Sequence, residues 1–141
     1  MPTRTSSARW EGDLRTGSGT VSTGSGTFQG NYSFPSRFEE GKGTNPEELV
    51  AAAHAACYSM ALSNGLAKAG YTPTSVETSA AVQFGPVDGG FAITRIDLTT
   101  RGEVPGIDAA EFAKQAADAK AGCPISKALA AVEITLDAQL V

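Results

Sequence analysis

Residues 49–67 limit the fold of this chain more than any other stretch, because they contain no Asp, Glu, Lys or Arg. Asn45 and Pro46 come just before them. Asparagine can cap free backbone N–H groups, and proline suits the first position of a helix. Two glutamates follow in the expected first turn, where carboxylates complement the helix dipole. A helix that is apolar nearly all round is a buried one. We therefore expect a long helix, ending at Gly70, inside the protein or at a subunit contact.

The segments before and after this helix have the pattern of strands. The first 43 residues are rich in Gly, Ser and Thr, and the β-prone pieces "ARWEG", "GTVST" and "NYSF" lie between glycines. They predict antiparallel strands with short turns, with a flexible linker as the alternative. Residues 75–84 alternate between apolar and more polar side chains, and Asp88-Gly89 predicts a hairpin into residues 90–104.

The C-terminal third predicts helices followed by a last strand. A second helix is expected over residues 106–122, capped by Asp108 and stopped by Gly122, and a short third helix begins at Pro124. Residues 132–141 place apolar side chains on one face of a strand. Strands with helices grouped between them indicate an α+β fold rather than a doubly wound sheet. The length of 141 residues fits a single domain over residues 1–141.

Composition and charge exclude several classes of function. Hydrophobic residues make up 41% and charged residues 18% of the chain, as is usual for a soluble globular protein. The net charge of −4 and the absence of a Lys/Arg cluster argue against nucleic-acid and membrane partners. The N-terminus has no apolar export segment, and no apolar stretch is long enough to span a bilayer. We expect a cytoplasmic protein, in which a permanent disulfide would be unusual.

The two cysteines, Cys57 and Cys123, are core residues, metal ligands or a reacting pair. Free cysteine packs like a small hydrophobe, so the first interpretation stays open. Cys123 precedes Pro124 at a helix start, where backbone N–H groups should lower the pKa of its thiol. Cys57 lies in the middle of a helix and would need a nearby cation to ionise.

A zinc site is a second interpretation of these cysteines. His54 and Cys57 share one helical face and Cys123 would be a third ligand, but the chain has no further Cys or His, and a carboxylate such as Glu47 would complete only a catalytic-type set. A structural zinc site needs four ligands, and this spacing matches no metal motif. We expect His54 to be a packed core or interface histidine.

A reacting thiolate needs a positive charge to stabilise it and a group that orients that charge. Arg37 is the candidate cation, and Glu47 can hold its guanidinium by a bidentate contact. Each residue also has a simpler interpretation. Arg37 would be a solvated loop charge, and Glu47 would be a carboxylate that favours the start of a helix. The spacing of the two residues alone leaves these alternatives open. Two interpretations are open for a set of five aromatic residues, which either line an apolar entrance to the site or form core. These residues are Phe28, Tyr32, Phe34, Phe38 and Tyr58.

Several motifs together resemble the osmotically inducible protein C (OsmC) family, which is related to the organic hydroperoxide resistance (Ohr) proteins. They are "ARWEGDL", "GTVST", "RFEEGKGTNPEELVAAAHAACYSMAL", "GFAITRI", "VPGID", "KAGCPIS" and "EITLD". The resemblance runs from about Ala8 to Leu140, and "GTNPEEL…AAC" followed by "AGCP" is its most specific part. The arginine in "RFEEGKGTNPEEL" matches the OsmC branch, since the Ohr branch carries its reactive arginine in an earlier Gly-rich loop.

The resemblance implies a fold and a reaction. The fold is α+β, with antiparallel sheets packed around long central helices in an intertwined homodimer. The reaction is cysteine-based reduction of organic hydroperoxides or hydrogen peroxide, without haem, flavin or metal. Cys57 would attack the peroxide and become a sulfenic acid, and Cys123 would resolve it to a disulfide. Arg37 would stabilise the Cys57 thiolate and Glu47 would orient Arg37. A dithiol such as a lipoylated protein would reduce the disulfide.

The length of the long helix adds an expectation about assembly. Ten residues separate Glu47 from Cys57, which is about 15 Å along a helix axis at roughly 1.5 Å per residue. A single glutamate side chain does not reach that far. Two such helices packed antiparallel at a two-fold interface would bring Glu47 of one subunit near Cys57 of the other. We therefore expect a homodimer with two sites, each built from both chains.

Overall fold

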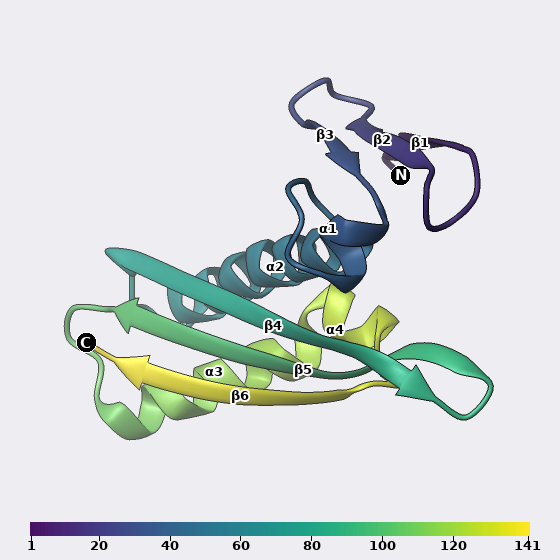
Figure 1. The fold of residues 1–141 in the computed structure, drawn as a ribbon. Coiled ribbons are helices and arrows are strands. Elements are labelled where there is room, and N and C mark those ends of the chain that lie inside the picture. The colour runs from purple at the N-terminus through teal and green to yellow at the C-terminus, as the bar shows by residue number, and fades with distance from the viewer. The chain divides into compact units, whose positions relative to one another are not determined.

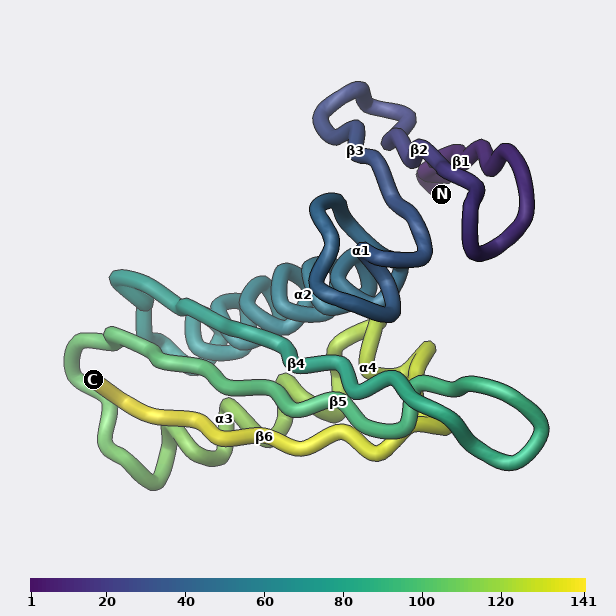
Figure 2. Tube along the Cα trace, viewed as in Figure 1, coloured from purple at the N-terminus to yellow at the C-terminus, as the bar shows by residue number.

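The computed structural model describes all 141 residues, which divide into two compact units, Met1–Leu49 and Val50–Val141. Figures 1 and 2 show the helices, strands and chain path of each unit. Each unit is described by itself, and the expectation of a single domain over residues 1–141 stays a prediction. No helix is both long enough and apolar enough to cross a membrane.

The first unit contains a small antiparallel sheet and a short helix. Strands β1 (Ser6–Glu11), β2 (Ser18–Thr23) and β3 (Gln29–Tyr32) pair in the order β1-β2-β3. The strands expected at "ARWEG" and "GTVST" are therefore confirmed, whereas the third strand ends at Tyr32 and so includes only the first half of "NYSF". Helix α1 (Phe34–Phe38) was not expected, because "NYSF" was assigned to a strand. Ser33 is instead the N-cap of α1, since its side chain and that of Ser36 form a reciprocal capping box on either side of Pro35.

Helix α2 (Pro46–Lys68) is the long helix expected from the charge-free stretch. Asn45 caps it as predicted, with its side-chain oxygen accepting the Glu48 backbone N–H at 2.7 Å. The chain leaves the helix at Gly70, which has a positive φ of 95°. The fully buried apolar side chains of α2 are Tyr58, Leu62 and Leu66, which lie in the core of the second unit.

The second sheet consists of β4 (Ser75–Val87), β5 (Gly90–Glu103) and β6 (Glu133–Leu140), in the order β4-β5-β6. β4 and β5 form the expected hairpin, in which Val87 pairs with Gly90 across the Asp88-Gly89 turn. β6 pairs parallel to β5, so the expectation of antiparallel sheets fails for this pair. The physical reason is the crossover through α3 (Ala109–Gly122) and α4 (Pro124–Ala128), which returns the chain to the end of the sheet where β5 began.

Helices α2 and α3 lie on the same face of this second sheet (Figure 1). Ile96 and Leu98 of β5 form the core with Phe112 and Ala116 of α3. The apolar faces expected on β4 and β6 also contact this core, through Val76, Ala80, Val82, Ile134, Leu136, Ala138 and Leu140. The mixed α+β fold predicted from the order of strands and helices is confirmed.

Candidate active site

The two thiols lie next to each other although 66 positions separate them in the chain. Cys57 is in the middle of α2, and Cys123 lies between the last residue of α3 and the first of α4. Their sulfur atoms are 3.0 Å apart, and both cysteines are free. The second unit alone therefore brings two reduced thiols into direct contact.

The two thiols differ in their access to solvent. Cys123 is fully buried in the core, whereas Cys57 is partly exposed. Cys57 lines a groove of about 680 Å³ between α2 and the end of α3, together with Met60, Ala61 and Gln115 among others. A small molecule in this groove can reach Cys57 but not Cys123.

The pKa values of the two thiols are shifted in opposite directions. Burial and the hydrogen bond with Cys123 raise the pKa of Cys57, against the effect of the Ile125 backbone N–H. Burial also acts against ionisation of Cys123. The Cys57 thiol, and after it the polar groups of Ser126 and the Ile125 N–H, outweigh the effect of burial and lower the pKa of Cys123. The expectation that Cys123 has the more acidic thiol is confirmed.

His54 lies one turn before Cys57 on α2 and is completely buried. Its Nε2 is 2.8 Å from the hydroxyl of Ser126 on α4, while its Nδ1 has no hydrogen-bond partner. Burial lowers the pKa of the imidazole. No three His, Cys, Asp or Glu side chains form a group that could hold a metal ion, so the set required for the zinc interpretation is not assembled. The expectation of a packed histidine is confirmed.

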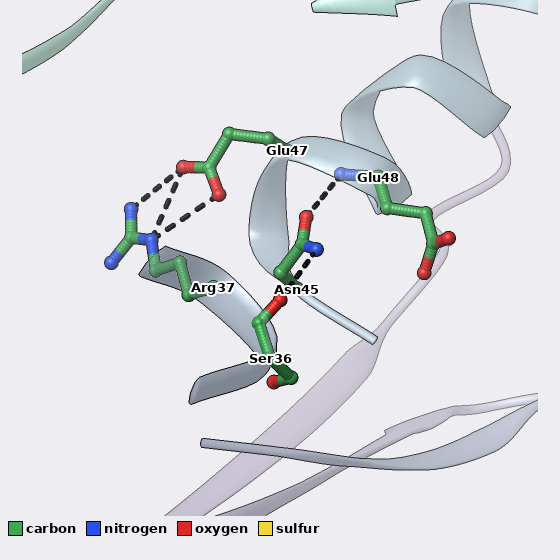
Figure 3. Close-up of polar contacts among 5 residues, drawn as sticks. All are labelled: Ser36, Arg37, Asn45, Glu47 and Glu48. Atoms are coloured by element: carbon green, nitrogen blue, oxygen red, sulfur yellow. Dashed lines mark hydrogen bonds and ion pairs between the residues drawn. The ribbon is translucent and has the colours of Figure 1, made fainter. Parts of the chain in front are cut away.

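Arg37 and Glu47 form an ion pair within the first unit (Figure 3). The guanidinium Nη2 donates to Oε1 of Glu47 at 2.7 Å, and Nε lies 3.3 and 3.2 Å from the two carboxylate oxygens. Two nitrogens facing two oxygens make the planar, forked contact that favours arginine over lysine. The Glu47 side chain is only 10% exposed. The Arg37 guanidinium is therefore fixed by an ion pair and is not a solvated loop charge.

Hydrogen bonds around Asn45 fix the two partners of this ion pair (Figure 3). The Asn45 amide donates to the Ser36 carbonyl at 3.0 Å while its oxygen caps α2 at the Glu48 N–H. Ser36 in turn donates its hydroxyl to the Thr44 carbonyl at 2.7 Å. One side chain thus connects α1, which carries Arg37, to the first turn of α2, which carries Glu47.

An aromatic pocket of about 260 Å³ lies beside Arg37 in the first unit. Three of the five aromatic residues expected at an entrance line it, namely Tyr32, Phe34 and Phe38. Trp10 and Leu14 complete the apolar wall. Tyr58 does not belong to it, because its ring is core and its hydroxyl donates to the Ala116 carbonyl at 3.0 Å.

Two parts of this arrangement were missed from the sequence. Helix α1 was missed, although serine three residues before serine, with proline between them, is a recognisable helix start. Ser126 was missed as a neighbour of both Cys123 and His54. Its position three residues after Cys123, in a predicted helix start, was the available indication.

Comparison with known proteins gives a consistent picture. The family model described as OsmC-like protein matches residues 39–137. The chain is 60% identical over 134 residues to Peroxiredoxin OsmC of Escherichia coli, covering 94% of this chain and 93% of that protein. It is 37% identical over 98 residues to an organic hydroperoxide resistance protein of Xanthomonas axonopodis, covering 68% and 67%. The structure is similar to an organic hydroperoxide resistance protein OsmC from Legionella pneumophila, with a TM-score of 0.74, 25% identity and 96% coverage of each chain.

Proposed function

The chain belongs to the OsmC family of cysteine-based peroxidases, and we propose that it reduces hydroperoxides to alcohols with Cys57 as the attacking thiol. The observation that carries this assignment is the pair of free thiols 3.0 Å apart, of which only Cys57 lines a groove. A peroxide must contact the attacking sulfur, whereas a resolving sulfur needs only to contact its partner. The buried position of Cys123 suits the second task.

The reaction has two steps. The Cys57 thiolate attacks the terminal oxygen of the hydroperoxide, an S–O bond forms, and the O–O bond breaks. The leaving alkoxide takes up a proton to become the alcohol. The Cys123 thiolate then attacks the sulfenic sulfur of Cys57, forming the S–S bond and releasing hydroxide, which becomes water on protonation. One hydroperoxide is reduced and two thiols are oxidised in each cycle.

Arg37 and Glu47 supply the charge that this chemistry requires. In the second unit, burial raises the pKa of Cys57, so an additional cation has to stabilise its thiolate. We assign this role to Arg37, with Glu47 fixing the plane of the guanidinium through the ion pair at 2.7 Å. The forked geometry and low exposure of Glu47 support this assignment, because they show a guanidinium held in one orientation.

Organic hydroperoxides are the substrate class that the first unit favours. The pocket beside Arg37 is walled by Trp10, Leu14 and Phe34, which would contact an apolar substituent on the peroxide. Hydrogen peroxide has no such substituent and would gain nothing from this wall. A dithiol such as a lipoyl group is the proposed reductant, because it can exchange with the Cys57–Cys123 disulfide and then cyclise. A cytoplasmic location stays a prediction from the sequence.

A homodimer with shared sites completes the proposal. Along α2, Ala52, Ala53, Ala56 and Met60 are exposed on a helix that has no charged side chain between Glu48 and Lys68. A second copy of this helix would bury that face. The roughly 15 Å rise from Glu47 to Cys57 along α2 supports sites in which the two residues come from different subunits.

Titration of the reduced protein with cumene hydroperoxide tests the proposed function against a non-enzymatic domain with two core cysteines. One equivalent should remove both free thiols, release the alcohol, and add no oxygen to the protein mass. Thiols that persist while the peroxide remains unconsumed would reject the peroxidase assignment.

A further inference from the structure

Arg15 stacks on the aromatic wall of the pocket in the first unit. It lies in the loop between β1 and β2, and its Cζ is 4.8 Å from the centroid of the Phe34 ring. Unlike Arg9 and Arg37, Arg15 forms no ion pair. A guanidinium within about 6 Å of a ring centroid is attracted by the electron-rich face of the ring. The contact that Arg15 makes is therefore with the pocket wall itself.

Phe34 is the first ring of a row that ends at Arg37. The rings of Phe34 and Phe38 are stacked, with centroids 4.7 Å apart and an interplanar angle of 27°. The Cζ of Arg37 is 5.5 Å from the Phe38 centroid. Because a ring has only two faces, Arg15 and Arg37 cover the outer faces of the stacked pair. Arg15 therefore closes the end of the row opposite to Arg37.

The loop between β1 and β2 is fixed by its own hydrogen bonds. The Asp13 carboxylate accepts the backbone N–H and the hydroxyl of Thr16 at 2.7 Å each, and the Asp13 carbonyl accepts the Gly17 N–H at 2.9 Å. The indole N–H of Trp10 faces the Gly12 and Asp13 carbonyls, at 3.0 and 3.2 Å. An aspartate that bonds groups a few residues later closes a compact turn. The loop therefore has a defined shape and is not a loose connection.

Leu14 follows Asp13 in this loop and lines the pocket, although its side chain is 57% exposed. An exposed leucine stays at a pocket only when the chain on both sides of it is fixed. Asp13 fixes the chain before Leu14 through the turn, and Arg15 fixes the chain after it through the Phe34 ring. The two neighbours together keep Leu14 at the pocket wall.

From these contacts we propose that Arg15 is a positioning residue that sets the preference of the protein for organic hydroperoxides over hydrogen peroxide. It holds Leu14 and the Phe34 ring, which would contact the organic substituent of the peroxide. Arg15 is not itself among the residues that line the pocket, so it acts through these two side chains. The proposal rests on the proposed function, in which this pocket receives the substituent.

The first test compares two peroxides in each variant. Arg15→Ala should lower kcat/KM for cumene hydroperoxide about threefold, the effect of one exposed cation–π contact. Leu14→Ala should lower it about fivefold, because apolar contacts with the substituent are lost. Both variants should keep the wild-type kcat/KM for hydrogen peroxide, which has no substituent, and the wild-type pH–rate profile. Arg15→Lys keeps a cation over the ring and Leu14→Met keeps an apolar wall, so each should restore most of the preference.

Arg9→Ala is the matched control for the loss of a guanidinium. Arg9 is an exposed arginine of the same unit, its guanidinium pairs with Glu11 at 2.9 Å, and it does not line this pocket. It should change neither rate. If Arg15→Ala lowers the two rates equally or shifts the pH–rate profile, Arg15 acts on folding or on the reacting thiol, which overturns the inference. Wild-type rates with both peroxides in Arg15→Ala overturn it as well.

The second test measures the pocket without any reaction. Trp10 is the single tryptophan of the chain and lines the pocket, so its fluorescence reports occupation. In a Cys57→Ser background, titration with 2-phenyl-2-propanol, the alcohol formed from cumene hydroperoxide, should change this fluorescence. Adding Arg15→Ala should weaken binding of the alcohol about threefold, whereas adding Arg9→Ala should not. An unchanged midpoint in the Arg15→Ala protein, or no response to the alcohol at all, contradicts the role of Arg15.

The two tests separate failure of this inference from failure of the peroxidase assignment. If the reduced protein consumes neither peroxide, the peroxidase assignment fails, while the alcohol titration still decides whether Arg15 shapes the pocket. If the protein is an active peroxidase and Arg15→Ala keeps the wild-type ratio of the two rates, only the role of Arg15 is rejected. Leu14 and Arg15 are both exposed, so their substitution leaves the core of each unit intact.

Discussion

Cys57 and Cys123 share one hydrogen bond but have different surroundings. Cys123 is enclosed in the core, and its sulfur contacts that of Cys57 at 3.0 Å. Cys57 opens onto a groove, and burial raises its pKa within its own unit. The more accessible thiol is therefore the one whose ionisation most needs a nearby cation, and in the proposed mechanism Arg37 is that cation.

Arg37→Ala should raise the pKa of Cys57, because removing a nearby cation withdraws stabilisation from the thiolate. At neutral pH a smaller fraction of Cys57 is then ionised, so we expect the rate constant with organic peroxide to fall roughly tenfold or more. The pH–rate profile should move to higher pH, with partial recovery of activity under alkaline conditions. Stopped-flow kinetics across pH measures this shift.

Two further variants make the Arg37 experiment specific. Arg37→Lys should rescue poorly, because an ammonium cannot reproduce the forked contact with Glu47. Arg95→Ala removes a guanidinium–carboxylate contact of 2.7 Å to Asp97 on β5 and should leave the profile in place. If Arg37→Ala keeps the wild-type pH–rate profile, Arg37 has no role in ionising Cys57.

At the scale of single residues, the sequence predicted the direction of a pKa shift but did not predict which distant side chains contact each other. The lower pKa of Cys123 agrees in direction with its position before Pro124, but the main cause that lowers it is the Cys57 thiol, and the backbone N–H groups of Ser126 and Ile125 add to that effect. The Ser126 contacts with His54 did not follow, because they join α2 to α4 across 72 positions of sequence. No local pattern specifies a contact of that kind, and only the packed core brings the two side chains together.

Among the elements, the start of α2 has two structural tasks, and both depend on Asn45. Asn45 caps the helix and also bonds the Ser36 carbonyl of α1, so one side chain sets both the helix start and the position of Arg37 relative to Glu47. Asp108 has only the first of these tasks, capping α3 through the Glu111 N–H at 2.8 Å. The two caps are therefore a matched pair.

Asn45→Ala and Asp108→Ala should each reduce the free energy of unfolding by about 1 kcal/mol, the usual cost of losing an N-cap. Only Asn45→Ala should also lower the rate of peroxide reduction, because Arg37 and Glu47 lose their common support. Chemical denaturation and peroxidase kinetics on both variants measure the two effects. Equal losses of activity in the two variants, or no loss in either, would show that Asn45 has no effect on peroxide reduction beyond capping a helix.

The elements themselves were largely predictable, with two instructive failures. Asn45-Pro46, Asp88-Gly89 and Asp108 marked their helix and hairpin boundaries correctly, because capping and turn formation depend on a few adjacent residues. The parallel pairing of β6 with β5 was not predicted, since pairing direction depends on the path of the intervening helices. Helix α1 is too short to show a hydrophobic period, and only its capping residues could have revealed it.

For the whole molecule, the central expectation is that two chains build each site. The exposed alanines of α2 and Met60, which is 75% exposed, give this helix an apolar face without a partner in the second unit. Burying such a face against a second copy is favourable by about 25 cal/mol for each Å² of apolar surface. A closed two-fold dimer is the simplest assembly that achieves it.

Mixing two inactive variants tests the shared sites. Cys57→Ser lacks the attacking sulfur and Glu47→Ala lacks the group that orients Arg37, so neither homodimer should reduce peroxide efficiently. Refolding the two proteins together should produce heterodimers with one intact site each, and part of the activity should return. A mixture that contains heterodimers by mass but stays inactive would mean that each site belongs to a single chain.

The assignment of Cys57 as attacking thiol and Cys123 as resolving thiol is tested most directly by the mass of the single-cysteine variants after exposure to excess organic peroxide. Without a resolving partner, Cys57 in the Cys123→Ser protein should pass through the sulfenic acid to a sulfinic acid, gaining two oxygen atoms at that residue. Cys123 in the Cys57→Ser protein should remain a thiol, because the core encloses it. Oxygen gained at Cys123 in the Cys57→Ser protein, with Cys57 unmodified in the Cys123→Ser protein, would reverse the two roles and contradict the proposed mechanism.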